Sequence, residues 1–436
     1  MVVLKFGGTS VGNAERIKNL LSLLPNKKCI VVLSAVSGTT NRLIKLSNFL
    51  KDDLKNDFAI ELIEFQSFYH ALINDLFKTD QFKQLAFEMI EMHISQLNKW
   101  KSGLYSKRRE NEIVSRGELI STSLFHLHLS EKNIPSNLIS ALDFMRLNED
   151  EEPDIIYIGQ EIKKVLKEDV QINITQGYIC RDKFGNISNL KRGGSDYSAS
   201  LIGEAINAEE IQIWTDIDGM HNNDPRIVDN TSPISSMSFD EAAELAYFGA
   251  KILHPQSIGP AQRANIPVKL LNTMMPEKGG TLISLGENQN RFLAIAAKDD
   301  ITSIRIKSTR MLMAYGFLRR IFEVFERYKT PIDLITTSEV AVSVTIDNKQ
   351  YLKEIIEELS QFGLVESKSD NSIICIVGKF EGDHPGYANQ VFKALKDIPI
   401  RMISYGGSRH NITLLVNSVN KKPALTSLHS SLFTDN

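Results

Sequence analysis

Strand-like and helix-like patterns of apolar residues alternate at the start of the chain and predict a layered α/β region there. Unbroken apolar runs at residues 2–6 and 29–33 predict buried strands, and a helical pattern at residues 13–24 joins them. This strand–loop–helix–strand order is typical of a parallel sheet covered by helices. Such sheets bind ligands at the carboxyl ends of their strands, where loops containing Gly7 and Gly38 begin.

A long helical stretch follows this first strand pair. Between residues 41 and 131 apolar side chains recur at helical spacing, which predicts amphipathic helices packed beside the sheet. Strand patterns return at residues 172–175, 178–180 and 211–214. A helix is expected over about 238–265, and the segment 278–284 closes the region.

The last third of the chain contains an internal repeat. The segment beginning at Pro331, PIDLITTSEVAVSVTI, parallels the segment beginning at Pro399, PIRMISYGGSRHNITLLV. Each copy follows a helix that is itself preceded by an apolar strand, at 302–306 and 373–377, and each copy is followed by a further helix. That order predicts two ferredoxin-like units. We expect a domain boundary near residue 289, where a polar run separates two strand patterns.

Composition narrows the class of protein. The chain has 436 residues, 42% hydrophobic and 24% charged, with a net charge of −3, which suits a globular protein of roughly two to four domains. No basic block suggests nucleic-acid binding. The three cysteines have no metal-binding spacing and fit a reducing cytosol. No signal peptide or membrane-length apolar run is evident, so a cytoplasmic location is expected.

The segment 5–10, KFGGTS, is the first candidate for chemistry. A strand-end lysine followed by Gly7 and Gly8 could bind phosphate, because glycines let backbone N–H groups approach the oxygens and the following helix favours negative charge. Taken alone the pattern fits an ordinary βα turn equally well. It is not a P-loop, and no P-loop or protein-kinase signature occurs elsewhere in the chain.

A second glycine loop, KRGGSD, occupies residues 191–196. Arg192 beside two glycines suits bidentate capture of a carboxylate or phosphate. Asp196 could organise the Mg²⁺ side of a nucleotide, whereas the plainer interpretation makes Ser195 and Asp196 helix caps.

Three further segments carry weaker signals. Residues 214–219 read WTDIDG, with DPR at 224–226, and could meet a nucleotide or simply form a polar turn. FGAK at 248–251 supplies a second lysine, Lys251, of a type usually found solvated at the surface. SRGE at 115–118 supplies Glu118, which could bind an amino group or merely face solvent on a helix.

One reaction class connects these segments. A carboxylate that accepts a phosphoryl group needs no general base, since it is already ionised at pH 7. Catalysis then depends on positioning and on charge neutralisation. The chain offers cationic residues and glycines for that purpose, but no convincing Ser-His-Asp arrangement and no histidine metal motif.

Taken together and in order, these segments resemble the aspartokinase family. The matching motifs cover most of the first 290 residues, and the repeated tail resembles the paired ACT domains of monofunctional, feedback-regulated members. The resemblance implies a three-layer α/β/α amino-acid-kinase fold with a mostly parallel sheet at 1–289. It implies a regulatory region at 290–436, with ACT domains at about 308–368 and 369–436, the latter sharing the strand 293–307.

The resemblance also implies an activity and a set of site residues. The activity is ATP- and Mg²⁺-dependent phosphorylation of L-aspartate to 4-phospho-L-aspartate, the first step of lysine, threonine and methionine biosynthesis, without a dedicated protein metal site. Thr40 and Arg192 would contact the carboxylates of aspartate, Glu118 its ammonium group, and Ser195 would also contact it. The nucleotide side would comprise Lys5, Gly7, Gly8, Asp196, Thr215, Asp216, His221, Arg226 and Lys251. Lys5, Asp196 and Lys251 would be catalytic. His221 departs from the usual tyrosine of the family, and Lys191 from the usual glycine.

The tail resembles lysine-inhibited members most closely. Asp333 would pair with the ammonium group of a lysine effector, although it could instead merely end a strand. The other effector positions implied are Met311, Gly316, Phe317, Leu318 and Ser338, of which Phe317 could simply be core. A homodimer or larger oligomer through the ACT domains is expected. The alternatives are a kinase of glutamate or acetylglutamate and a silent amino-acid sensor; the SRGE motif and ACT tail oppose the first, and the intact motifs oppose the second.

Overall fold

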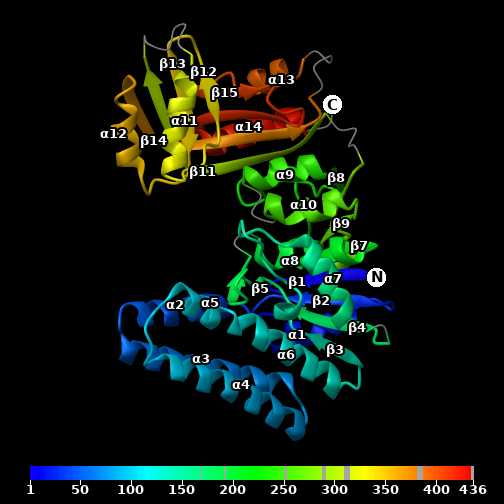
Figure 1. Ribbon diagram of the computed structural model, residues 1–436. Coiled ribbons are helices and arrows are strands. Elements are labelled where there is room, and N and C mark those ends of the chain that lie inside the picture. Colours follow the sequence, from blue (N-terminus) through cyan, green and yellow to red (C-terminus); the bar gives the residue numbers. More distant parts are fainter. Residues whose placement is uncertain are drawn as a thin grey trace. The chain divides into compact units, whose positions relative to one another are not determined.

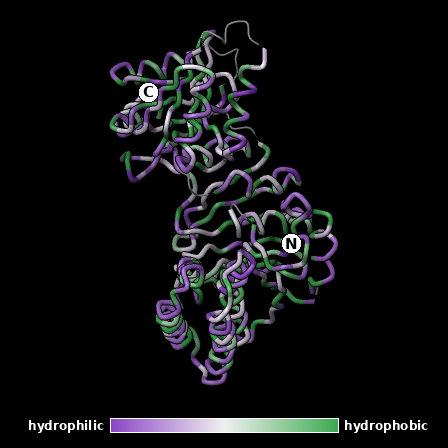
Figure 2. Tube along the Cα trace, turned by 60° about the vertical axis from the view of Figure 1, so that its left-hand side comes forward, coloured by the Kyte–Doolittle hydropathy of each residue, from purple (hydrophilic) through white to green (hydrophobic). Residues whose placement is uncertain are grey.

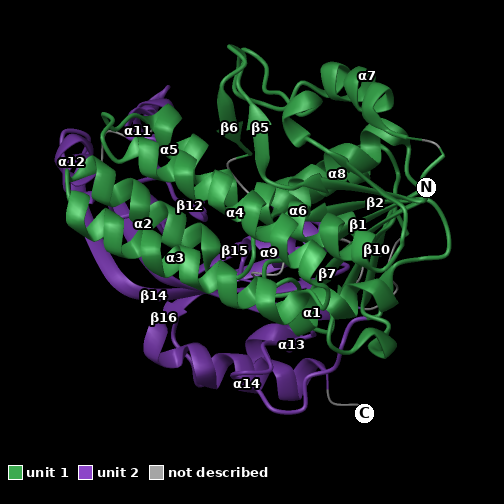
Figure 3. Cartoon of the chain, turned by 90° about the horizontal axis from the view of Figure 1, so that it is seen from below, with its two compact units in different colours: residues 1–220, 235–239, 253–286 green, residues 221–234, 240–252, 287–436 purple. Residues whose placement is uncertain are grey.

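The computed structural model describes residues 1–167, 169–190, 193–249, 253–286, 291–308, 315–380 and 386–433. These residues form two compact units (Figure 3). Unit 1 comprises residues 1–220, 235–239 and 253–286, and unit 2 comprises residues 221–234, 240–252 and 287–436. The described part contains no helix with both the length and the apolar character needed to cross a membrane.

Unit 1 is built on an eight-stranded, mostly parallel sheet, which confirms the predicted fold class (Figure 1). The strand order is β3-β4-β2-β1-β7-β9-β10-β8, and only the β9–β10 neighbours are antiparallel. The strands are β1 (Val2–Phe6), β2 (Cys29–Leu33), β3 (Ser136–Ile139), β4 (Ile172–Gln176), β7 (Glu210–Thr215), β8 (Ser236–Ser238), β9 (Val268–Asn272) and β10 (Thr281–Ser284). A two-stranded hairpin, β5 (Ile179–Arg181) with β6 (Ile187–Asn189), stands apart from this sheet.

The strand alternation decides which side chains face which helical layer. Val2, Leu4 and Phe6 of β1 belong to the main hydrophobic core, which also holds the apolar faces of the N-terminal helices. Because successive side chains of a strand point to opposite faces, Lys5 faces the other side of the sheet. Unit 1 therefore presents a lysine between two buried strand neighbours, at the edge where β1 ends.

The helical stretch predicted for residues 41–131 is confirmed. It consists of α2 (Thr39–Lys51), α3 (Lys55–Leu76), α4 (Asp80–Trp100), α5 (Lys107–Val114) and α6 (Arg116–Glu131), and it joins α1 (Ala14–Asn19) on one side of the sheet. Hydrophilic and hydrophobic segments alternate along the long α3–α4 hairpin (Figure 2), as expected for helices that bury one face.

The opposite face of the sheet carries α7 (Ile155–Val165), α8 (Gly194–Ile206) and α10 (Pro255–Arg263). The single helix expected over 238–265 is wrong. The chain instead forms α9 (Phe239–Tyr247) and α10, because Gly249 adopts a φ of +139° and Pro255 begins the second helix.

Unit 2 contains a six-stranded antiparallel sheet with the order β12-β13-β11-β14-β16-β15. Its strands are β11 (Phe292–Lys307), β12 (Ile335–Thr337), β13 (Ala341–Ile346), β14 (Leu364–Gly378), β15 (Ile400–Tyr405) and β16 (Asn411–Asn417). The two copies of the repeat have separate cores, one around α11 (Phe317–Arg327) and α12 (Leu352–Leu359) and one around α13 (Tyr387–Ala394) and α14 (Lys421–Leu432). The predicted pair of ferredoxin-like units is confirmed.

Two earlier stretches of the chain also pack into unit 2. The backbone N–H of Ile295 donates to the carbonyl oxygen of Asn222, and the Asn411 side-chain amide donates to Glu244 of α9. Gly249 lies so close to β11 that a Cβ atom there would collide with the carbonyl oxygen of Ala297. The FGAK segment predicted for nucleotide binding thus begins against a strand of the six-stranded sheet of unit 2.

Candidate active site

A cavity of about 520 Å³ opens at the carboxyl ends of the parallel strands of unit 1. This is the edge at which open α/β sheets bind ligands. The cavity contains eight of the residues predicted for substrate or nucleotide binding. They are Lys5, Gly7, Gly8, Thr40, Glu118, Ser195, Thr215 and Asp216.

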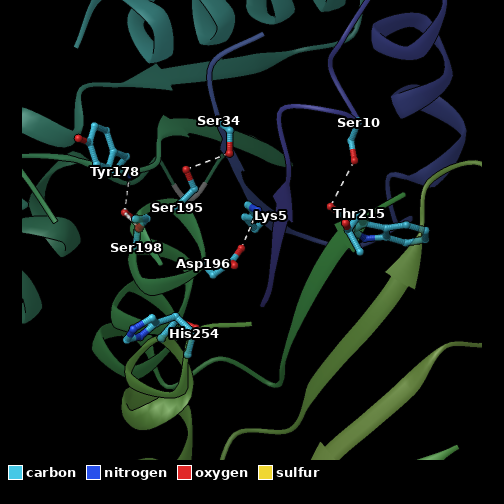
Figure 4. A network of polar contacts seen from close by, with 12 residues as sticks. Lys5, Ser10, Ser34, Tyr178, Ser195, Asp196, Ser198, Thr215 and His254 are labelled. Carbon is cyan, nitrogen blue, oxygen red and sulfur yellow. Dashed lines mark hydrogen bonds and ion pairs between the residues drawn. The ribbon is translucent and has the colours of Figure 1, made fainter. Parts of the chain in front are cut away.

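Lys5 reaches the cavity from the carboxyl end of β1, where it is the penultimate residue. Its ammonium nitrogen lies 2.6 Å from Oδ1 of Asp196 in the first turn of α8 (Figure 4). Both side chains are largely shielded from solvent, with 11% and 14% exposure. Asp196 thereby holds the Lys5 ammonium group beside the cavity, where an anionic ligand could compete with it for that charge.

Two loops place backbone atoms at the cavity wall. Gly8 packs so closely that a Cβ atom would lie 3.0 Å from the carbonyl oxygen of Ala35, and Gly38 adopts a φ of +81° before α2 begins. Both positions therefore suit glycine for steric reasons. Gly7 donates its N–H to the carbonyl oxygen of Trp214 at 3.1 Å. The phosphate-binding role of Gly7 and Gly8 stays a prediction.

Glu118 is the most perturbed carboxyl group in the cavity. The side chain is buried at 3% exposure, so the solvent-exposed interpretation is wrong. Oε1 accepts an N–H hydrogen bond from Ala35 at 3.3 Å, whereas Oε2 is buried without a hydrogen-bond partner among the described residues. Burial raises the pKa of Glu118 to about 8, against the weaker opposing effect of backbone hydrogen bonds. A ligand ammonium group would satisfy Oε2 and restore the ionised form.

Arg116, two residues earlier, faces away from Glu118 because helical neighbours at this spacing do not share a side. Its guanidinium carbon lies 5.1 Å from the centre of the Trp100 ring, and NH1 is 3.4 Å from Nδ1 of His93. Gly117 between them packs against Ala35, where a Cβ atom would lie 2.7 Å from the alanine side chain. These contacts fix the start of α6 and, with it, the direction of Glu118.

Ser195 joins a polar pair that the sequence did not predict. Ser34, directly after β2, donates its hydroxyl to Oγ of Ser195 at 2.9 Å (Figure 4). Ser34 also lines the cavity. Its place after an apolar strand at the ligand-binding edge was the signal that could have identified it.

Tyr178 is a second lining residue that sequence reasoning missed. It has a φ of +68°, which is uncommon outside glycine, and its N–H donates to Oγ of Ser198 at 2.9 Å (Figure 4). The preceding Gly177 packs on Ser195, and Gly194 packs on the Tyr178 ring. Backbone strain such as that of Tyr178 is often found at binding sites.

Other predicted residues lie outside this cavity or outside the described part. Arg192 and Lys251 are not among the described residues. His221 and Arg226 belong to unit 2. There Nδ1 of His221 is 3.1 Å from Oγ1 of Thr231, and the Arg226 guanidinium binds Asp224 through two hydrogen bonds of 2.9 and 2.7 Å. Their nucleotide roles stay predictions.

The predicted effector residues that the structure describes lie in the first repeat of unit 2. Gly316 caps α11 with a φ of +77°, Phe317 is buried in the core around α11, and Leu318 is 38% exposed. Ser338 forms a backbone hydrogen bond with Ala341. Met311 lies outside the described residues. The Asp333 carboxylate already forms an ion pair with Lys298.

The described residues contain no cluster of three or more His, Cys, Asp or Glu side chains that could hold a metal by themselves. Mg²⁺ in kinase sites is commonly held by one or two carboxylates together with substrate phosphates. Asp196, and Asp216 at the end of β7, provide carboxylates of that type beside the cavity.

Comparison with known proteins identifies the family to which the chain is similar. The amino acid kinase family model matches residues 1–272, and an ACT domain model matches residues 374–432. Lysine-sensitive aspartokinase 3 of Escherichia coli K12 is 34% identical, with 99% of both chains covered. The crystal structure of E. coli aspartokinase III in complex with aspartate and ADP, called the R-state, superposes with a TM-score of 0.87 at 33% identity, covering 100% of both chains. The same enzyme with lysine and aspartate, called the T-state, gives a TM-score of 0.81 at 32% identity over 100% of both chains.

The family model covers more than half of the chain, and the similarity to aspartokinases extends over its whole length. The predicted resemblance is therefore confirmed. The chain belongs to the amino acid kinase family and, within it, to the aspartokinases.

Proposed function

We propose that the chain transfers the γ-phosphoryl group of ATP to the side-chain carboxylate of L-aspartate, giving 4-phospho-L-aspartate and ADP. The observation that carries this proposal is Oε2 of Glu118, which is buried without a partner among the described residues, in the cavity that also contains Lys5. An acidic site of this kind suits a free ammonium group, and a cationic one suits a phosphate. Acetylglutamate, whose nitrogen carries no charge, would leave Glu118 unmatched.

Several of the predicted residues would bind and orient the aspartate substrate. Glu118 would bind the ammonium group of aspartate, while Thr40 and Arg192 would hold its carboxylates. Because Ser34 donates to Ser195, the Ser195 hydroxyl keeps its own proton available for the substrate. These contacts would hold one side-chain oxygen of aspartate in line with the γ-phosphorus atom.

Charge stabilisation would come from Lys5 and Lys251. The aspartate oxygen forms a new bond to phosphorus as the bond to the β-phosphate oxygen breaks, and no proton has to move because the nucleophile is already ionised. Lys5 would leave Asp196 to meet the negative oxygens of the transferring group. Gly7, Gly8, Thr215, Asp216, His221 and Arg226 would complete the nucleotide side. Mg²⁺ would neutralise phosphate charge, held by the phosphates and by Asp196.

We further propose a regulatory region at 290–436 that binds L-lysine, following a catalytic region at 1–289. The E. coli relative is named lysine-sensitive, and its T-state structure contains lysine. In this chain Asp333 already binds the ammonium group of a lysine side chain, so its carboxylate suits that ligand. The effector site would include Met311, Gly316, Phe317, Leu318 and Ser338. We propose the cytoplasm as the location and a homodimer or larger oligomer, paired through ACT domains, as the assembly.

The test is ATP-dependent acyl-phosphate formation from L-aspartate, trapped with hydroxylamine, with and without L-lysine. Turnover of aspartate but not of glutamate, suppressed by lysine, is the expected result. Turnover without suppression would remove lysine as the effector and leave the kinase proposal standing. No turnover of aspartate would overturn the proposed reaction.

A further inference from the structure

Asp333 is the centre of a four-residue cluster in unit 2. Its side chain is only 1% exposed, and Oδ1 lies 2.7 Å from the ammonium nitrogen of Lys298 on β11. The Tyr247 hydroxyl at the end of α9 donates to the same oxygen at 3.0 Å. The Lys298 nitrogen also lies 2.9 Å from Asp347 and 4.8 Å from the centre of the Tyr247 ring. We call these residues, Tyr247, Lys298, Asp333 and Asp347, the Asp333 cluster.

The backbone of β11 directs Lys298 into this cluster. The pairing of β11 with β14 shifts its register between Lys298 and Ile301, and Asp300 has a φ of +62°. A bulge of this kind changes the direction of a side chain beside it. Burial by itself would lower the pKa of Lys298, but its hydrogen bonds to Asp333 and Asp347 outweigh that effect and raise the pKa. The lysine therefore stays charged where it meets Asp333.

The second carboxylate oxygen of Asp333 could accept a further hydrogen bond. Oδ2 is buried and has no hydrogen-bond partner among the described residues. An amino-acid effector that brings its own ammonium group to Asp333 would place two positive charges on one carboxylate. At that separation like charges repel strongly in a shielded site, so the two cations must compete.

The cluster is also tied to the FGAK segment. Tyr247 directly precedes Phe248, and the two rings make an edge contact with centres 4.9 Å apart. The next residue, Gly249, packs against the carbonyl of Ala297, which is the neighbour of Lys298. Phe248 and Gly249, the two described residues of the FGAK segment, therefore contact the cluster or the immediate neighbour of Lys298.

We propose that Lys298 competes with the effector for Asp333. Its ammonium group binds the Asp333 carboxylate in the effector-free chain and is displaced when the amino-acid effector binds. The exchange is transmitted to the FGAK segment through the Tyr247 hydroxyl. This inference rests on the proposed role of Asp333 as the partner of the effector ammonium group. It assigns to Lys298 the function of setting the effector concentration at which the enzyme responds.

The test compares full-length variants, each normalised to its own uninhibited rate. Lys298→Met keeps the apolar stem and removes the charge. If Lys298 occupies Asp333 in about nine of ten molecules, its removal lowers the half-inhibiting lysine concentration about tenfold. Lys298→Arg keeps a cation and should stay within about twofold of the wild type. Lys421→Met is the matched control, because Lys421 makes a similar 2.6 Å ion pair with the adjacent Asp299. It should leave the lysine response unchanged.

The outcomes separate this inference from the proposed effector. If wild type and Lys298→Met both fail to bind lysine in calorimetry and fail to respond to it, the effector and the inference are both overturned. If the wild type responds and Lys298→Met is equally or less sensitive, only the inference is overturned. A silent wild type with a responsive Lys298→Met variant would support the inference. Thermal melts of each variant establish that the chain is folded.

The relay through Tyr247 has its own measurement. Tyr247→Phe removes the hydroxyl and keeps the ring. Calorimetry should show lysine still binding, while the maximal inhibition at saturating lysine falls by at least about half. Unchanged maximal inhibition would overturn the relay and leave the competition at Asp333 standing.

Discussion

The ammonium group of Lys5 on β1 and the carboxylate of Asp196 in the first turn of α8 form an ion pair of 2.6 Å. Neither side chain is more than 14% exposed, so the pair is held in a shielded position at the cavity. It links the segment 5–10 to residues 193–196, the described part of the second glycine loop. Under the proposed reaction, phosphate oxygens would replace the Asp196 carboxylate as the partner of the Lys5 ammonium group.

Lys5→Ala should lower kcat by at least about 10²-fold, because the proposed role of Lys5 is to neutralise negative charge that develops in the transition state. The measurement is steady-state kinetics on aspartate and ATP, with circular dichroism to check the fold. Lys27→Ala is the control, since Lys27 pairs with Glu209 at 2.6 Å on the exposed surface of the same unit. That variant should keep wild-type kinetics. Near-normal turnover of Lys5→Ala would remove Lys5 from the phosphate site.

Glu118 should make aspartate binding dependent on pH. Its pKa of about 8 in the empty cavity means that it is mostly protonated at pH 7, whereas an ammonium ligand requires the carboxylate. Binding should therefore release about one proton at pH 7, and kcat/KM for aspartate should rise between pH 6 and pH 8. Titration calorimetry in buffers of different ionisation enthalpy measures the released proton. Release of no proton would contradict the assignment.

Glu118 should also make the free energy of unfolding depend on pH. Between its ordinary pKa of 4.5 and about 8, the folded chain holds a proton on Glu118 that the unfolded chain has released. The contribution of this group to the free energy of unfolding therefore falls as pH rises through that window. Glu118→Gln should remove this trend, so that the variant gains stability relative to the wild type from pH 5 to pH 8. Denaturant unfolding at several pH values tests it.

Gly177 should be intolerant of a side chain. A Cβ atom there would lie 2.5 Å from the Ser195 side chain and next to the strained Tyr178. Gly177→Ala should destabilise unit 1 by about 1–3 kcal/mol and raise KM for aspartate more than KM for ATP. Gly159→Ala is the matched control, because nothing lies within 4 Å of a Cβ atom at that helical position. It should be neutral or stabilising. Equal behaviour of both variants would show that the Gly177 contact does not shape the aspartate site.

Local patterns of the sequence were enough to predict much of this fold. Apolar runs and helical spacing identified β1, β2 and the helices of residues 41–131. The repeat beginning at Pro331 and Pro399 identified the two ferredoxin-like units that share the six-stranded sheet. The break between α9 and α10 was missed, because the apolar pattern continues through Gly249, whose positive φ is imposed by packing against Ala297. Contacts between distant segments leave no periodic signal.

The candidate site was predictable to a similar degree. Short motifs at the end of a strand and at the start of a helix gave lining residues such as Lys5 and Glu118. Ser34 and Tyr178 were missed because serine and tyrosine are common in loops, and only the fold brings them to Ser195 and Ser198. Lys298 was missed because it lies in a strand without a chemical motif, and only the fold brings it to Asp333, beside a register shift in β11.

Asp333→Asn should raise the half-inhibiting concentration of L-lysine by at least about tenfold. The amide keeps the size of the side chain and removes the charge that an effector ammonium group would bind, and such an ionic hydrogen bond contributes about 1.5–3 kcal/mol. The matched variant is Asp347→Asn, which removes the other carboxylate of Lys298 at a position that is 41% exposed. Because Asp347 is screened by solvent, its loss should change the response less than about threefold. The measurement is a lysine titration of the hydroxylamine-trapped product for both variants. If both variants shifted equally, the effector would be responding to the summed charge of the cluster, and Asp333 would not be its specific partner.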